Sequence, residues 1–225
     1  MVITLFGIGL SLIKSMSMTK EQAAMEQYLE EKYGQEFNVE KPKYEGGGFG
    51  VDGTWEATAS PVTDKTLIFR VGATKNLDYF SDQYVAAIWS REQAEKAQPA
   101  IKAIYGDNSG TKVTVRVIFS GDLEKEATLT SPSYEDAKRD YAERGFYYMY
   151  TIHTSSGNDI STEAKKVYEL IELARKDGIK KVGVRYIERK DGDELVSNLG
   201  ASKTDSITDA SQVEEYLGKK VKMEE

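Results

Sequence analysis

His153 is the residue best suited to acid–base chemistry, because it is the only histidine in the 225-residue chain. It lies in a hydroxyl-rich run that also contains Thr151, Thr154, Ser155 and Ser156. A positioned imidazole can take the proton of a serine hydroxyl and make that serine a nucleophile. The chain has no Gly-x-Ser-x-Gly elbow, so a hydrogen-bonded or exposed strand histidine is the favoured interpretation, and a hydrolase using His153 is the alternative.

Carboxylates offer a second kind of site. Asp191, Asp193 and Glu194 have the hard oxygen atoms that calcium prefers, but the run lacks the spacing of a calcium loop and Asp191-Gly192 suits a hairpin turn. The turn is the favoured interpretation. A carboxylate pair for glycoside chemistry stays open, because the separation of two carboxylates depends on the fold.

A glycine run matches a nucleotide-binding pattern without its context. Gly48-Phe-Gly-Val-Asp-Gly53 fits the dinucleotide fingerprint, which works by ending a strand and opening a helix. Here a predicted helix precedes the run and the alternating residues of Thr54 to Ala59 follow it. We therefore expect no nucleotide site, no metal site and no other cofactor.

Composition narrows the chemistry further. The absence of cysteine removes disulfides, thiolate catalysis and zinc–thiolate sites. The net charge of −7 argues against general nucleic-acid binding, which depends on Lys and Arg neutralising phosphates. Residues 161–190 nevertheless hold nine Lys or Arg against five Asp or Glu, leaving −11 for the rest of the chain. An anionic partner for this segment is one interpretation, and a solvated helix face is the favoured one.

Aromatic residues are numerous, with 14 tyrosines. Five aromatic residues, four tyrosines and one tryptophan, would either line a binding groove or pack in a core: Tyr84, Trp89, Tyr147, Tyr148 and Tyr150. Because they alternate along a strand or share a helix face, a core position is the simpler interpretation.

The elements that would position these residues are clearest between 146 and 190. Phe146 to Ile152 predicts a strand, Ser161 to Lys176 a helix and Lys181 to Arg189 a second strand. The helix has apolar residues at three-and-four spacing, which predicts one stripe packed on a sheet, formed by Val167, Leu170, Ile171 and Ala174.

Local signals bound this segment. Ser161 is the predicted N-cap, and Gly178 the left-handed residue after the helix. Beyond the Asp191-Gly192 turn, Leu195 to Leu199 predicts a strand that pairs back. Earlier in the chain, Thr19 and Gln22 form a capping-box pattern for a helix that ends at Gly34.

An earlier segment repeats the strand–helix–strand order. Thr66 to Ala73 predicts a strand, Asp78 or Ser81 a cap for a helix that Pro99 bends or restarts, and Val113 to Phe119 a closing strand. The closing strands share Val-x-Val-Arg-x-Ile, which suggests an internal duplication, although strand propensity alone would produce a similar match. The turn-rich run 120–132 separates a half at 18–122 from a half at 133–218, and 219–225 is a predicted frayed tail.

The N-terminal segment 1–17 differs from the rest of the chain. Met1 to Ile13 is almost wholly apolar, and its length suits a targeting or anchor segment better than a full membrane span. No basic residue precedes it and Lys14 follows it, against the usual orientation bias. A buried N-terminal helix or strand is the alternative.

A family resemblance covers roughly residues 1–106. The apolar segment, the stretch Tyr28 to Phe37, the Gly-rich run, Asp82-Gln-Tyr84 and Trp89 resemble small uncharacterised envelope proteins of Gram-positive bacteria, many of them lipoprotein-like. The resemblance implies a place at the cell membrane or outside it and brings no catalytic residues. The chain departs from the lipoprotein pattern because no cysteine follows the apolar run.

We predict an α+β protein of two small halves, each a mostly antiparallel or mixed sheet with helices on one face. The favoured function is a non-enzymatic binding or structural module of the bacterial cell envelope, with an unknown protein or envelope component as partner and anchoring through Met1 to Ile13. The alternative from another class is an acidic inhibitor or immunity-type protein that masks a basic partner.

Overall fold

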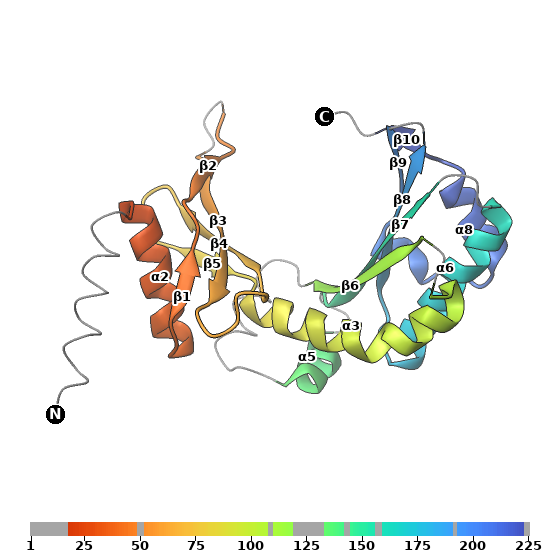
Figure 1. Cartoon of the computed structure of the whole chain (residues 1–225), viewed down its shortest axis with the longest axis horizontal. Coiled ribbons are helices and arrows are strands. Elements are labelled where there is room, and N and C mark those ends of the chain that lie inside the picture. The colour runs from red at the N-terminus through yellow and green to blue at the C-terminus, as the bar shows by residue number, and fades with distance from the viewer. Residues whose placement is uncertain are drawn as a thin grey trace. The chain divides into compact units, whose positions relative to one another are not determined.

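The structure is a computed structural model that describes residues 18–48, 52–107, 110–118, 133–141, 145–155, 159–190 and 193–222. The apolar segment Met1 to Ile13 lies outside these residues. The chain is an α+β protein with two compact units, Met1–Tyr84 and Val85–Glu225, each of which contains one five-stranded sheet (Figure 1).

The first unit packs helix α2 (Lys20–Tyr33) against an antiparallel sheet. The strand order is β1-β3-β4-β5, and β2 pairs with β3 beside β1. The strands are β1 (Phe37–Val39), β2 (Lys43–Glu45), β3 (Thr54–Pro61), β4 (Phe69–Thr74) and β5 (Phe80–Asp82). Alternate residues of β3 and β4 point under the helix, where Met25 and Leu29 are fully buried.

The predicted ends of α2 are confirmed. The Thr19 hydroxyl accepts from the backbone N–H of Gln22 at 3.2 Å, and Gly34 takes the left-handed conformation at φ +67°. The Gln22 side-chain amide donates to the Val39 carbonyl at 2.6 Å. The cap thus also fastens α2 to β1.

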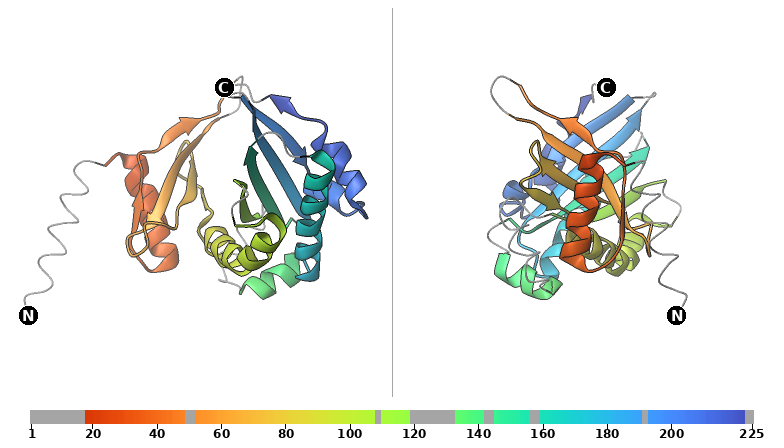
Figure 2. Two further views of the ribbon diagram at one scale, coloured as in Figure 1. Left: turned by 45° about the vertical axis from the view of Figure 1, so that its right-hand side comes forward. Right: turned by 90° about the vertical axis from the view of Figure 1, so that its left-hand side faces the viewer.

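The second unit has a mixed sheet with the order β10-β9-β8-β7-β6. The central strands β7 and β8 are parallel and joined by helix α6, and every other pair is antiparallel. Figure 2 shows α6 and α8 side by side along one face of this sheet. The strands are β6 (Lys112–Ile118), β7 (Tyr147–Ser155), β8 (Val182–Lys190), β9 (Asp193–Leu199) and β10 (Val221–Lys222). The helices are α3 (Tyr84–Tyr105), α5 (Tyr134–Tyr141), α6 (Ile160–Lys176), α7 (Ala201–Thr204) and α8 (Ala210–Leu217).

The apolar stripe of α6 forms the centre of this unit. Its four predicted residues Val167, Leu170, Ile171 and Ala174 are all at most 1% exposed, which confirms the stripe. Gly178 adopts φ +80° after the helix, as predicted. The predicted N-cap Ser161 is wrong: Asp159 caps the helix, because its carboxylate accepts from both the backbone and the hydroxyl of Thr162 at 2.8 and 2.7 Å.

Helix α3 also begins differently from the prediction. Asp78 and Ser81 do not cap it, because residues 80–82 form strand β5 and the helix starts at Tyr84. The Asp82 carboxylate accepts from the backbone N–H of Tyr84 at 3.0 Å. The helix then continues through Pro99 to Tyr105.

The boundary between the halves lies earlier than the predicted 120–132. β6 follows the long helix α3 and pairs with β7, so it belongs to the second sheet although it precedes the turn-rich run. That run lies outside the described residues, between β6 and α5 of one unit. Turn-rich composition therefore marked a connection within a unit.

The suggested internal duplication is wrong for the same reason. Strands β4 and β5, which precede α3, lie in the first sheet and β6, which follows it, lies in the second, whereas β7 and β8, which flank α6, are direct neighbours. The shared Val-x-Val-Arg-x-Ile pattern thus reflects strand propensity. The tail also differs from its prediction, since Val221 and Lys222 pair with Val196 and Leu195 at the free edge of β9.

Candidate functional site

The candidate site is the face of the second sheet that lies opposite α6 and α8, which we call the open face. Alternate residues of β7 are buried toward the helices, with Tyr148, Tyr150 and Ile152 all at most 3% exposed. The residues between them, Met149, Thr151 and His153, are half-buried on the other side.

The strand register fixes which residues are neighbours on the open face. Three rows cross the sheet from β6 through β7 to β8: Arg116–Met149–Gly183, Thr114–Thr151–Arg185 and Lys112–His153–Ile187. The rows continue onto β9, where Asn198 lies opposite Arg185 and Val196 opposite Ile187.

Four cations dominate this face. Lys112 and Arg116 on β6, and Arg185 and Arg189 on β8, are all exposed. The one described carboxylate of the face is Glu194, whose Oε1 accepts from the Arg189 guanidinium at 2.9 and 3.0 Å. The described residues of the open face thus carry a net charge of +3, although the whole chain carries −7.

A glycine shapes one end of the open face. A Cβ atom on Gly183 would lie 2.6 Å from the Met149 Cε and 3.8 Å from the backbone nitrogen of Ala201 at the start of α7. The missing side chain lets the Met149 thioether lie across β8. No side chain therefore projects from β8 in this row.

Among the described residues, no serine is hydrogen-bonded to His153. Within the described residues, the imidazole takes part in no hydrogen bond or ion pair. Thr154 points to the opposite face, where its hydroxyl lies 3.1 Å from that of Thr111. Ser155 shares the open face with His153, and Ser156 lies outside the described residues.

The carboxylates near the β8–β9 connection do not converge either. Asp191 lies outside the described residues, and Glu194 is engaged with Arg189. No group of three or more His, Cys, Asp or Glu in the described part of the chain is placed to hold a metal ion. The antiparallel pairing of Lys190 with Asp193 fits the predicted hairpin.

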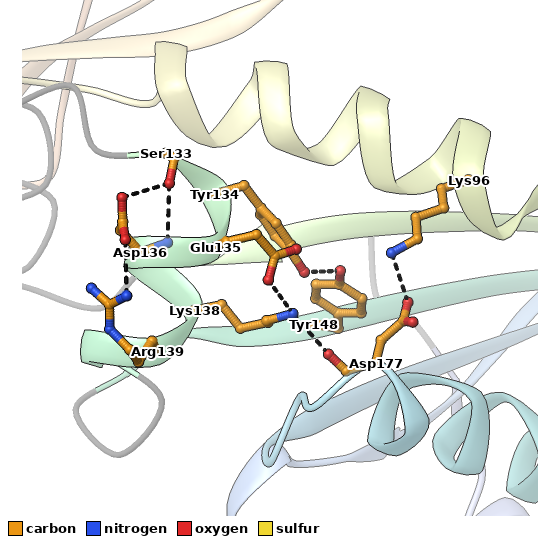
Figure 3. A network of polar contacts seen from close by, with 9 residues as sticks. All are labelled: Lys96, Ser133, Tyr134, Glu135, Asp136, Lys138, Arg139, Tyr148 and Asp177. Carbon is orange, nitrogen blue, oxygen red and sulfur yellow. Dashed lines mark hydrogen bonds and ion pairs between the residues drawn. The ribbon is translucent and has the colours of Figure 1, made fainter.

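Tyr148 of β7 belongs to a network of polar contacts on the helix side of the sheet (Figure 3). The hydroxyls of Tyr134 on α5 and Tyr148 on β7 are hydrogen-bonded to each other. Burial raises the pKa of Tyr134 to about 12 and raises the pKa of Tyr148 as well. Lys138 donates to the Asp177 carbonyl at 3.0 Å, which ties α5 to the end of α6. These contacts support the core interpretation of Tyr148.

A buried carboxylate lies under the first turn of α6. Glu163 is 1% exposed and pairs with Lys166 at 2.8 Å, while the Tyr186 hydroxyl lies 3.5 Å from its Oε2. The Lys166 ammonium also lies over the Tyr105 ring. Burial raises the pKa of both tyrosines. Among the buried side-chain nitrogen and oxygen atoms of the described residues, the Tyr105 hydroxyl alone has no hydrogen-bond partner.

The first unit contains a buried carboxylate with a complete set of partners. Asp82 accepts from Tyr28 at 2.8 Å, from Lys32 at 2.6 Å and from Tyr33 at 2.7 Å, in addition to the Tyr84 N–H. All of these donors come from the two stretches on which the family resemblance rests, Tyr28 to Phe37 and Asp82-Gln-Tyr84. The resemblance stretches therefore meet in a structural network.

The outer face of the first sheet is a weaker candidate. It has a shallow depression of about 300 Å³ between β1 and β3, lined in part by Glu40, Thr58 and Lys65. Glu40 and Lys65 give this depression both signs of charge, and Thr58 already donates to Glu40 at 2.5 Å. A surface of mixed sign gives no clear preference for a charged partner, unlike the open face.

Sequence reasoning missed the open face because it assigned the basic excess of residues 161–190 to a helix surface. The structure places Arg185 and Arg189 of that excess on β8. Lys112 and Arg116 lie outside the segment and join them only through the order of the strands. The spacing of Lys112, Thr114 and Arg116 at every second residue was the available signal.

Comparisons with known proteins give little further information. No protein-family model matches the chain, and no curated protein matches it. Among solved structures, the chain is similar to a DUF5037 family protein from Ruminococcus gnavus, with 15% sequence identity, a TM-score of 0.47 and 75% of each chain covered. No described helix is both long enough and apolar enough to cross a membrane.

Proposed function

We propose that this chain is a non-enzymatic binding module of the bacterial cell envelope and that the open face of its second sheet is the binding surface. The observation that carries the proposal is the charge of that face, +3 among its described residues on a chain of −7. These cations lie on β6 and β8, on either side of β7, and together they give the face a positive potential that suits an oppositely charged partner.

The envelope assignment rests on the sequence. The apolar run Met1 to Ile13 supports targeting or anchoring, and the resemblance to envelope proteins supports the same compartment. The lack of an assembled reactive centre among the described residues near His153 favours binding over catalysis. The surface chemistry supports this assignment and the fold does not, because unrelated functions share α+β folds.

Cell fractionation tests the location. The full chain and a chain that starts at Ser17 are expressed in parallel, and protease is added to intact protoplasts. We expect the full chain to be membrane-bound and accessible to protease, and the shorter chain to be soluble. If both forms remain protected in the cytoplasm, the envelope assignment is wrong.

An acidic inhibitor that masks a basic partner is the second candidate. The net charge of the chain is −7 and that of the described open face is +3, so the rest of the chain carries a net charge of −10. This acidic remainder favours the inhibitor. A salt-sensitive complex with a basic protein, unaffected by changes on the open face, would support it over the binding module.

A further inference from the structure

The cations of the open face alternate from side to side of strand β7. The register places Arg116 of β6 in one row, Arg185 of β8 in the next and Lys112 of β6 in the third. Arg189 of β8 follows in the fourth row, opposite Ser155, where it is already paired with Glu194. Rows are two residues apart, so a cation recurs about every 6.6 Å along β7, first on one side and then on the other.

The space between these cations is a neutral strip. β6 and β8 each lie one strand from β7, so the two sides of the strip are separated by about 10 Å. The strip consists of the open-face residues of β7: Tyr147, Met149, Thr151, His153 and Ser155. None is a carboxylate, and three carry a hydroxyl that can donate to an anion: Tyr147, Thr151 and Ser155.

We infer that this track binds a linear phosphodiester polymer that has no bases, such as a polyol phosphate chain, lying along β7. The inference rests on the proposed function, because it names the ligand class of the same open face. To pair each cation with one negative charge, the polymer must carry single charges separated by neutral units. A polyol phosphate chain has this pattern, because a short neutral polyol separates one phosphate from the next. Three of the four cations are arginines, whose planar forks match phosphate oxygens.

Two other polyanions fit the track less well. An extended acidic peptide has a carboxylate on every residue, but successive side chains point to opposite sides, so half of its charges would face away from the cations. Single-stranded nucleic acid needs aromatic rings on which successive bases stack. The rings of the strip, Tyr147 and His153, are about 20 Å apart, and Tyr148 and Tyr150 point into the core.

The test measures binding of a fluorescent glycerol phosphate oligomer to the purified full chain by polarisation. The test variant is K112Q/R116Q, and the control K165Q/K176Q removes two exposed cations from α6, on the other side of the sheet. We expect the test variant to weaken binding at least tenfold and the control to change it less than twofold. The logarithm of the binding constant should fall with the logarithm of salt concentration at a slope of about −2 to −3, and the test variant should reduce that slope by about 1.4.

Competitors identify the polymer class. Unlabelled glycerol phosphate oligomer should displace the probe, and oligothymidylate and oligoglutamate of equal charge should displace it less than one tenth as well. Tighter binding of oligothymidylate or oligoglutamate overturns the inference, as does equal loss of binding in the two variants.

The proposed function and this inference fail in different ways. If the full chain is exposed on protoplasts but neither binds the oligomer nor depends on Lys112 and Arg116, the inference is wrong and the envelope module stands. If the oligomer binds as expected but the chain stays inside the cell, the envelope assignment is wrong and the recognition of phosphodiester charge remains.

Discussion

The ammonium of Lys32 lies 2.6 Å from the Oδ2 atom of Asp82, whose side chain is fully buried. The two residues are 50 positions apart in sequence and join helix α2 to strand β5. The pair lies beside the stacked rings of Tyr28 and Phe80. The first unit is thus held together by a polar contact as well as by its apolar core.

Asp82→Asn should destabilise the first unit by about 2–4 kcal/mol, because it leaves the Lys32 charge without its buried partner while the amide keeps part of the hydrogen bonding. Each unit contains one tryptophan, Trp55 in the first and Trp89 in the second. In a Trp89→Phe background, Trp55 fluorescence follows urea unfolding of the first unit. The exposed pair of Lys75 and Asp52 is the control, and Lys75→Ala should leave the midpoint unchanged. An unchanged midpoint for Asp82→Asn would contradict the network.

The second unit should lose stability in alkaline solution. Burial raises the pKa of Tyr134 to about 12 from an ordinary value of 10.0, so the unfolded chain releases this proton first. The stabilisation is complete below pH 10 and is lost as the pH rises through about 12. In a Trp55→Phe background, Trp89, whose ring lies 5.9 Å from that of Tyr134, reports this unit. Tyr134→Phe should flatten the loss between pH 10 and 12, and an equally steep loss would refute the assignment.

Gly183→Ala should cost about 1 kcal/mol, because its methyl group would displace the tip of the Met149 side chain. That cost should disappear in a Met149→Ala background, since the clash is then removed. A double-mutant cycle by urea unfolding measures the coupling. Additive effects would mean that the two residues do not share this space.

His153→Ala should leave export and unfolding close to those of the parent chain. The reason is that the imidazole has no hydrogen-bond partner among the described residues. Hydrolysis of a chromogenic ester panel, measured for both proteins, checks the alternative. An activity of the parent chain that His153→Ala abolishes would favour the hydrolase.

The sequence predicted those parts of the fold that local patterns determine. The stripe of α6, the Thr19 cap and the turn-forming Gly178 follow from spacing within a few residues. Strand order does not, because pairing joins distant segments. The placement of β6 in the second sheet therefore could not be predicted from composition around residue 120.

The candidate site was harder to predict for the same reason. Lys112 and Arg185 come from strands on either side of β7, and only the register brings them onto one face. The Asp82 network has the same character, since Tyr28 and Lys32 share a helix face but the carboxylate arrives from β5. Nothing in the sequence around Asp82 indicated which residues would donate hydrogen bonds to it.

The most direct test of the account is sedimentation of the purified full chain with isolated envelope from the expressing bacterium. Three proteins are compared: the parent chain, K112Q/R116Q, and the charge-matched K165Q/K176Q. The account predicts that the parent and the α6 control sediment with the envelope at low salt, while the open-face variant stays in the supernatant. Sedimentation of all three to the same extent would contradict the claim that the open face is the binding surface.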